Sequence, residues 1–203
     1  HRWASNNTQL FPRDFTFEAV AERIRKNGEP GAAFMDNIRA FGRMNGDCSV
    51  LPPPVKWLDA LVAGFNPCAE QCLEDHELCC LGELNPNRHA TLEDFLVTIK
   101  YAYMYCKAVT LIPTSRPKTN RVMTKNRRIG LSMMGVFKMY ERLGLNECIR
   151  WWNAGYEEVR YWDRVYSGWL GCNPSIKVTS VKPGGTIPLL VGEEGGMKVP
   201  TAS

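Results

Sequence analysis

The sequence predicts an α/β fold. Short apolar runs typical of buried strands alternate along the chain with longer amphipathic patterns typical of helices. Glycine and proline stand at many of the boundaries between these segments. The 203 residues are 44% hydrophobic and 23% charged, an ordinary composition for a globular protein. The length allows one large or two small domains.

The first third of the chain is predicted to begin with a polar loop and to continue with two helices. In the opening segment RWASNN, Ser5 and Asn6 are candidates for contact with a substrate, although local turn hydrogen bonds explain the same residues. Apolar side chains at i, i+3, i+4 and i+7 predict a first helix from Asp14 to about Asn27, which Gly28 ends. The next predicted elements are a turn over 29–31, a short apolar strand, a helix over 36–43 and a proline-rich loop over 45–56.

Two short apolar runs in the middle of the chain fit buried strands. They cover residues 61–65 and 78–84, and they flank a loop that begins with NPCAEQ. Residues i−2, i and i+2 of an extended or tightly looped segment point the same way. We therefore expect Asn66, Cys68 and Glu70 to face one small volume, which brings together an amide, a reactive sulfur and a carboxylate that can move a proton.

The second half of the chain alternates helices with two further strand candidates. A capping-box variant, with Thr91 as the N-cap and Asp94 in place of the usual glutamate, predicts a helix that runs to about Val109. The remaining predicted elements are a polar helix over 119–126, a strand over 128–135, a helix over 136–143, a long helix over 147–170 and a strand over 176–181. The last strand runs into KPGGT, whose backbone N–H groups suit an anion, although a plain turn fits equally well.

Charge and cysteine usage argue against several classes of function. The net charge of +4 is not gathered into a basic stripe interleaved with aromatic residues, so we expect no nucleic-acid binding. No run of about 18 apolar residues is present, so we expect no membrane span. The eight cysteines lack the paired spacing of a structural zinc site, and we expect no metal. No apolar secretory segment opens the chain, which favours reduced thiols in a cytoplasmic protein.

Seven separate motifs occur in the order that one enzyme family shows. They are RWASNN at 2–7, NGEPG at 27–31, DNIRAFGRM at 36–44, NPCAEQ at 66–71, ELCCLGE at 77–83, TNRVMTKNRRIG at 119–130 and IKVTSVKPGGT at 176–186. Through them the chain resembles the catalytic chain of ribonucleotide reductases, most closely the monomeric adenosylcobalamin-dependent (class II) type. The resemblance implies a fragment of the ten-stranded α/β barrel of that family, with NPCAEQ in its central finger loop. Residues 1–203 would then all belong to the catalytic barrel domain, truncated at both ends.

The resemblance also implies a role for each residue of the central stretch. Cys68 matches the cysteine that becomes a thiyl radical, and Glu70 matches the general base for the substrate 3′-hydroxyl. Asn66 matches the amide that holds the substrate hydroxyls. Cys79, eleven residues after Cys68, matches one of the two cysteines that form a disulfide as the 2′-hydroxyl leaves. The candidates for contact with the substrate phosphates, in the KPGGT loop, are Gly184, Gly185 and Thr186.

The cofactor and the partners follow from the same resemblance. It implies adenosylcobalamin as cofactor, a ribonucleoside triphosphate as substrate, an allosteric dNTP effector, and thioredoxin or a similar reductant. Two alternatives stay open at this point. One is a ribonucleotide reductase with an iron-dependent or glycyl-radical start, against which the spacing of Cys68 and Cys79 argues. The other is a degenerate nucleotide-binding module that keeps the fold without the chemistry.

The chain departs from the family pattern at several positions. Gly184 stands where the family usually has serine, and Lys198 stands where it tends to have histidine. The cysteine expected to pair with Cys79 and a C-terminal cysteine pair are not in this sequence. We therefore expect an internal piece of a longer protein, which by itself cannot complete turnover.

Overall fold

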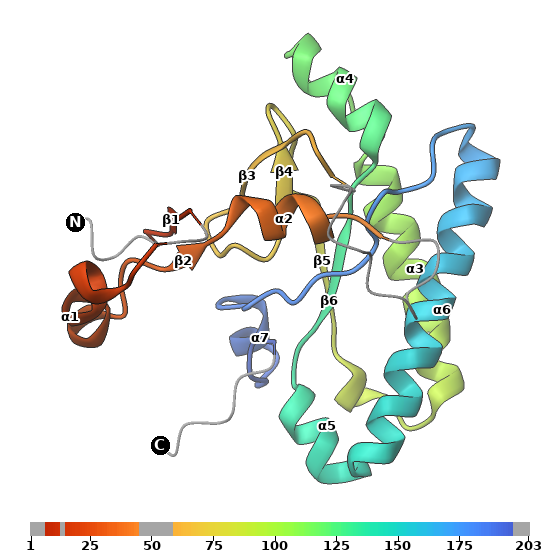
Figure 1. Ribbon diagram of the computed structural model, residues 1–203. Helices are drawn as coiled ribbons and strands as arrows, with labels where there is room; N and C mark the ends of the chain where they lie inside the picture. The colour runs from red at the N-terminus through yellow and green to blue at the C-terminus, as the bar shows by residue number, and fades with distance from the viewer. Residues whose placement is uncertain (1–6, 13–14, 45–58, 197–203) are drawn as a thin grey trace. The chain divides into compact units, whose positions relative to one another are not determined.

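The computed structural model describes residues 7–12, 15–44 and 59–196 (Figure 1). Contacts divide the chain into two compact units, His1–Glu77 and Leu78–Ser203. Both units combine helices with short strands, so the predicted α/β class is confirmed. Within the described ranges, no helix is long and apolar enough to cross a membrane.

The first unit opens with a small parallel strand pair and two helices. Its elements are β1 (Gln9–Leu10), α1 (Glu18–Asn27), β2 (Ala32–Ala33), α2 (Met35–Phe41), β3 (Val62–Phe65) and β4 (Cys72–Glu74). Gly28 ends α1 as predicted, with a φ of 71°, and its N–H donates to the Ile24 carbonyl at 2.7 Å. Asp14 and the predicted loop over 45–56 lie outside the described residues, but the predicted start of the first helix is wrong, because α1 begins only at Glu18 with Phe17 at its N-cap position.

The loop that carries NPCAEQ joins two antiparallel strands, β3 and β4, with Phe65 opposite Cys72. The prediction that the run over 78–84 supplies the second flanking strand is therefore wrong. β4 was missed because it is only three residues long and reads CLE, which lacks an apolar run. The strand within 78–84 is β5 (Leu81–Leu84), and it pairs with β6 (Gly130–Met133) instead.

The second unit is built around the parallel pair of β5 and β6. Its further elements are the 3-10 helix η2 (Pro86–Arg88), α3 (Leu92–Val109), α4 (Pro117–Asn126), α5 (Val136–Leu143), α6 (Leu145–Leu170) and α7 (Ile187–Leu190). The strand register runs from Leu81 opposite Gly130 to Leu84 opposite Met133. The long helix α6 lies alongside α3 (Figure 1).

Local signals explain where α3 begins and how it packs. Thr91 caps α3 as predicted, because its hydroxyl accepts the Asp94 N–H at 3.2 Å. On α6, a Cβ added to Gly155 would lie 3.0 Å from Cδ1 of Ile99, so the glycine permits the close approach of α6 to α3. The buried core of this unit includes Phe95, Ile99, Tyr103, Met139, Trp151, Val159 and Tyr166.

The strand predicted over 176–181 is reduced to an isolated parallel bridge between Thr179 and Leu131. The segment nevertheless follows β6, because the Leu131 N–H donates to the Val178 carbonyl at 3.0 Å. The prediction of a strand over 176–181 is therefore wrong, because one isolated bridge is too short to count as a β-strand. α7, a single turn that begins after Thr186, was not predicted.

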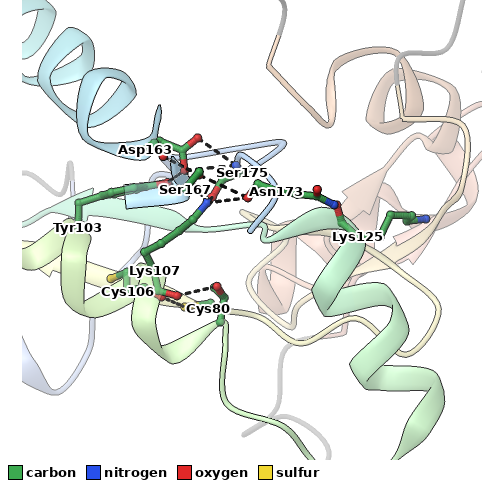
Figure 2. Close-up of polar contacts among 10 residues, drawn as sticks. Cys80, Tyr103, Cys106, Lys107, Lys125, Asp163, Ser167, Asn173 and Ser175 are labelled. Atoms are coloured by element: carbon green, nitrogen blue, oxygen red, sulfur yellow. Dashed lines mark hydrogen bonds and ion pairs between the residues drawn. The ribbon is translucent and has the colours of Figure 1, made fainter. Parts of the chain in front are cut away.

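A buried polar network fixes the segment that follows α6 (Figure 2). Lys107 on α3 and Asp163 on α6 form an ion pair, with 2.8 Å between Nζ and Oδ1. Lys107 also donates to the Asn173 carbonyl and to the Ser175 hydroxyl, each at 3.0 Å. The Tyr103 hydroxyl donates to Asp163 at 2.8 Å, and burial together with the Asp163 charge raises the pKa of Tyr103. From this anchor the chain runs past β6 to the KPGGT loop.

Candidate active site

A tight turn presents the NPCAEQ motif at the end of the β3–β4 hairpin. The Ala69 N–H donates to the Asn66 carbonyl at 2.9 Å, and Ala69 is left-handed with a φ of 61°. The Gln71 N–H donates to the Asn66 side-chain oxygen Oδ1 at 3.0 Å, and the Asn66 N–H donates to the Gln71 carbonyl at 3.0 Å. Asn66 thus closes the loop with both its backbone and its side chain.

The three motif residues differ in exposure. Asn66 is buried, Glu70 is half-buried and the Cys68 thiol is exposed. The segment is a turn and not an extended strand, so strand alternation does not set these orientations. The convergence of the three side chains on one small volume stays a prediction. The turn leaves Cys68 accessible to a reactant.

Sequence reasoning passed over Gln71, which is the most buried residue of this loop. Its exposed fraction is 0%, and within the described ranges neither its Oε1 nor its Nε2 atom has a hydrogen-bond partner. Its backbone, however, makes both of the hydrogen bonds that join the two ends of the turn. The sequence indicated this role of Gln71 in closing the turn only through its position directly after NPCAE.

Two adjacent cysteines before β5 have opposite environments. Cys79 is exposed and forms no disulfide with any described cysteine. Cys80 is 8% exposed, and its Sγ lies 3.5 Å from the Cys106 carbonyl oxygen. Hydrogen bonding to Cys106, reinforced by burial, raises the pKa of the Cys80 thiol, which therefore stays protonated at neutral pH. Cys79 is the accessible thiol of the pair, whereas Cys106 is buried with an exposed fraction of 4%.

The KPGGT loop is bound to β5 and β6 from one side. The Lys182 N–H donates to the Ser132 hydroxyl at 2.8 Å, and the Lys182 ammonium forms an ion pair with the Glu83 carboxylate. The Glu83 side chain is 1% exposed. Of the three residues predicted to contact the substrate phosphates, Gly184 is buried, whereas Gly185 and Thr186 are exposed. Sequence reasoning missed Glu83, because nothing in the ELCCLGE motif indicates what its glutamates contact.

A second ion cluster secures the chain after α7. The Glu193 carboxylate, 2% exposed, lies 3.2 Å from Nε of Arg88 and 3.4 Å from Nζ of Lys138. Burial alone would raise the pKa of Glu193, but hydrogen bonding to Asn85 and the charge of Lys138 lower it below its ordinary value. Lys138 also donates to the Gly192 carbonyl at 2.7 Å.

Some predicted residues cannot be placed. Ser5, Asn6 and Lys198 lie outside the described ranges. Among residues 7–12, 15–44 and 59–196, no group of three or more His, Cys, Asp or Glu side chains is arranged to hold a metal. The candidate residues that the structure describes form two separate groups, the NPCAEQ turn in the first unit and Cys79 with the KPGGT loop in the second.

No protein-family model matches the chain. Curated relatives match nearly all of it. A probable adenosylcobalamin-dependent ribonucleoside-triphosphate reductase of Dictyostelium discoideum is 43% identical over 98% of this chain. The adenosylcobalamin-dependent ribonucleoside-triphosphate reductase of Euglena gracilis is also 43% identical over 98%. The chain spans only 25% and 26% of the lengths of these two relatives.

A solved structure gives the same result at the level of the fold. The crystal structure of a B12-dependent (class II) ribonucleotide reductase aligns with a TM-score of 0.82 and 33% identity, over 97% of this chain and 30% of that one. Sequence and fold thus place the chain among the catalytic chains of ribonucleotide reductases. Within them it belongs to the class II, adenosylcobalamin-dependent family, of which it represents a segment.

Proposed function

We propose that the full-length protein reduces ribonucleoside triphosphates to 2′-deoxyribonucleoside triphosphates through a thiyl radical on Cys68. The observation that carries this proposal is the exposed Cys68 thiol at the tip of a turn closed by Asn66. Relatives that are 43% identical to this chain are named adenosylcobalamin-dependent ribonucleoside-triphosphate reductases, which supports the proposed reaction. Because the chain spans about a quarter of their length, the remainder of the protein is proposed to complete the catalytic centre.

The residues of the turn have separate roles in the first chemical step. The Cys68 radical takes the 3′-hydrogen atom from the ribose and becomes a thiol, while Glu70 accepts the proton of the 3′-hydroxyl as a general base. Asn66 holds the ribose hydroxyls in position, and its own side chain is steadied by the Gln71 N–H at 3.0 Å. Because Cys68 is exposed in this chain, the remainder of the full-length protein must exclude water around the turn to protect the radical from side reactions.

Cys79 supplies one of the two thiols that reduce the substrate. The substrate 2′-hydroxyl leaves as water, and Cys79 with a second cysteine outside this chain gives up two electrons and two protons to form a disulfide. One thiol proton leaves in the water and the other is added at the 2′-carbon. Glu70 then returns its proton to the 3′-oxygen, and Cys68 returns its hydrogen atom to the 3′-carbon and becomes a radical again. The exposure of Cys79, beside the buried Cys80, fits a disulfide that a reductant such as thioredoxin restores to thiols by exchange.

Adenosylcobalamin, when bound, supplies the radical that starts the reaction at Cys68. The feature of this chain that fits such a cofactor is the exposed Cys68 thiol, which an external radical source can reach. The proposed substrate contacts are Ser5, Asn6, Gly184, Gly185 and Thr186. We further propose that residues 1–203 lie in one catalytic barrel domain, that a dNTP effector binds elsewhere in the protein, and that the protein is cytoplasmic.

Replacement of the radical cysteine tests the proposal. In the full-length protein, Cys68→Ala should reduce dNTP formation by about a thousandfold or more, because alanine has no S–H bond from which the radical can form. Equilibrium dialysis with the triphosphate should show that substrate binding is retained. Cys172→Ser removes a half-buried thiol outside the candidate site and is the control, which should keep its activity.

The outcomes separate the open alternatives. Cobalamin-dependent dNTP formation by Cys68→Ala would overturn the radical assignment. Turnover that needs an iron centre or a glycyl radical in place of adenosylcobalamin would identify another class of reductase. Nucleotide binding without turnover under any radical source would identify a degenerate binding module.

A further inference from the structure

Position 184 has no room for a side chain. An ideal Cβ added to Gly184 would lie 2.1 Å from Oε1 of Glu83 and 2.8 Å from Cγ of Pro188. Real Cβ atoms essentially never come within 3.0 Å of another heavy atom. A serine at this position therefore cannot be accommodated while Glu83 stays in place.

Glu83 is held in that position through Oε2, whereas Oε1, the atom nearest the added Cβ, has no hydrogen-bond partner among the described residues. Its side chain is 1% exposed, and its Oε2 accepts a hydrogen bond from Nζ of Lys182. Glu83 lies on β5 directly opposite Ser132 on β6. The Ser132 hydroxyl in turn accepts the backbone N–H of Lys182 at 2.8 Å. The ammonium and the backbone of Lys182 are thus bound to two residues that face each other across one strand pair.

Two glycines that follow α7 pack closely against the same loop. A Cβ added to Gly195 would lie 1.8 Å from the Gly184 carbonyl oxygen, and one added to Gly196 would lie 2.7 Å from the Lys182 carbonyl oxygen. Backbone therefore packs directly on backbone at this point. The KPGGT loop is confined by Glu83 and by Gly195, so its conformation depends on both contacts.

We propose that Glu83 is the positioning residue of the KPGGT loop and that Glu83 and Gly184 form a matched pair. The buried carboxylate holds Lys182 and fills the space that a side chain at position 184 would need. Gly184 is then a requirement of this chain and not a lost hydroxyl contact. The inference rests on the proposed function, because it assumes that this loop is the binding site of the substrate phosphates.

Three variants of the full-length protein test the pair. Gly184→Ser should raise the KM for the ribonucleoside triphosphate by about tenfold or more with a smaller change in kcat, because the loop serves binding and not the chemical step. Glu83→Asp/Gly184→Ser shortens the carboxylate by one methylene group and should recover most of the affinity. Glu83→Gln/Gly184→Ser keeps the length of the side chain and should stay impaired.

Two further measurements make the test independent of turnover. Binding of inorganic tripolyphosphate should weaken in parallel with the rise in KM, because it probes the binding site of the phosphates alone. Thermal unfolding of every variant is followed as well: if Gly184→Ser does not fold, Glu83→Asp should restore folding and Glu83→Gln should not. Gly168→Ala on α6, where an added Cβ meets nothing within 4 Å, is the control and should behave as the wild type.

Two results would overturn the inference. One is a Gly184→Ser variant with the wild-type KM or a lower one. The other is recovery by Pro188→Ala in place of Glu83→Asp, which would make the proline ring the real obstacle. Failure of the proposed function looks different, because the wild-type protein would then not reduce triphosphates, whether or not it binds them. The unfolding measurements would still report on Glu83 and Gly184 in that case.

Discussion

Lys107 and Asp163 form an ion pair of 2.8 Å in which the lysine side chain is 0% and the aspartate side chain 5% exposed. The same carboxylate accepts the Ser175 N–H at 3.0 Å and the Tyr103 hydroxyl at 2.8 Å. Two helices, α3 and α6, and the segment after α6 therefore meet at one charged group. A buried ion pair adds little net stability, but removal of one partner leaves an uncompensated charge in the core.

Lys107→Met should accordingly lower the free energy of unfolding by about 3–5 kcal/mol. Lys107→Met/Asp163→Asn removes both charges and should recover part of this loss, which urea unfolding followed by tryptophan fluorescence measures. Lys118→Met, at an exposed position on α4, is the control and should change the free energy of unfolding by less than about 0.5 kcal/mol. A Lys107→Met variant as stable as this control would contradict the anchoring role.

Some helix boundaries were predictable because their signals are local in sequence, although the predicted start of α1 at Asp14 was not correct. Gly28 ends α1 by adopting a positive φ, and Thr91 caps α3 with a hydrogen bond to a residue three positions away. Gly144 ends α5 in the same local manner, with its N–H donating to the Tyr140 carbonyl at 2.8 Å. Each of these signals can be evaluated without knowing what the helix packs against.

The strands and the buried charges were harder to predict because they depend on distant partners. Lys107 lies 56 residues from Asp163, and Glu83 lies 99 residues from Lys182. No periodicity in the sequence connects such pairs. β4 is too short to show a pattern, and the segment over 176–181 alternates like a strand yet makes only one bridge.

The candidate site could be predicted only in part. The motif resemblance, and not hydrophobic periodicity, singled out Cys68 and Cys79 and suggested their roles. The sequence could not show that Cys79 is exposed and its neighbour Cys80 buried, because exposure depends on how β5 packs against α3. Nor could it show that the Asn66 side chain closes its own loop through Gln71.

Alkylation should distinguish the two adjacent cysteines. In the reduced chain, Cys79 should react with iodoacetamide at least about tenfold faster than Cys80, because the Cys80 thiol is buried and its raised pKa keeps it protonated. Mass spectrometry of the peptide that contains both residues measures the two rates. The half-buried Cys172 serves as an internal reference and should react at an intermediate rate. Equal rates at Cys79 and Cys80 would contradict the difference in their environments.

Glu193 should make the stability of the protein depend on acid pH. Its folded pKa is lowered, so its contribution is fully present above the unfolded pKa of about 4.3 and is lost as the pH falls through the folded value. Glu193→Gln should therefore melt at a lower temperature than the wild type at pH of about 7, and the difference should shrink below about pH 4. Melting curves across this pH range measure the effect. A difference that stays constant with pH would show that the Glu193 charge does not stabilise the fold through Arg88 and Lys138.

Asn66→Ala and Asn66→Asp should separate closure of the turn from contact with the substrate. Aspartate keeps an oxygen that accepts the Gln71 N–H, whereas alanine does not, so hydrogen exchange at the Gln71 amide should rise by about tenfold or more only in Asn66→Ala. Both variants lose the amide N–H donors, so dNTP formation by the full-length protein should fall by about tenfold or more in each. Unchanged exchange in Asn66→Ala would show that the 3.0 Å hydrogen bond does not hold the loop. Full activity in Asn66→Asp would remove the Asn66 amide from the proposed contacts with the ribose hydroxyls.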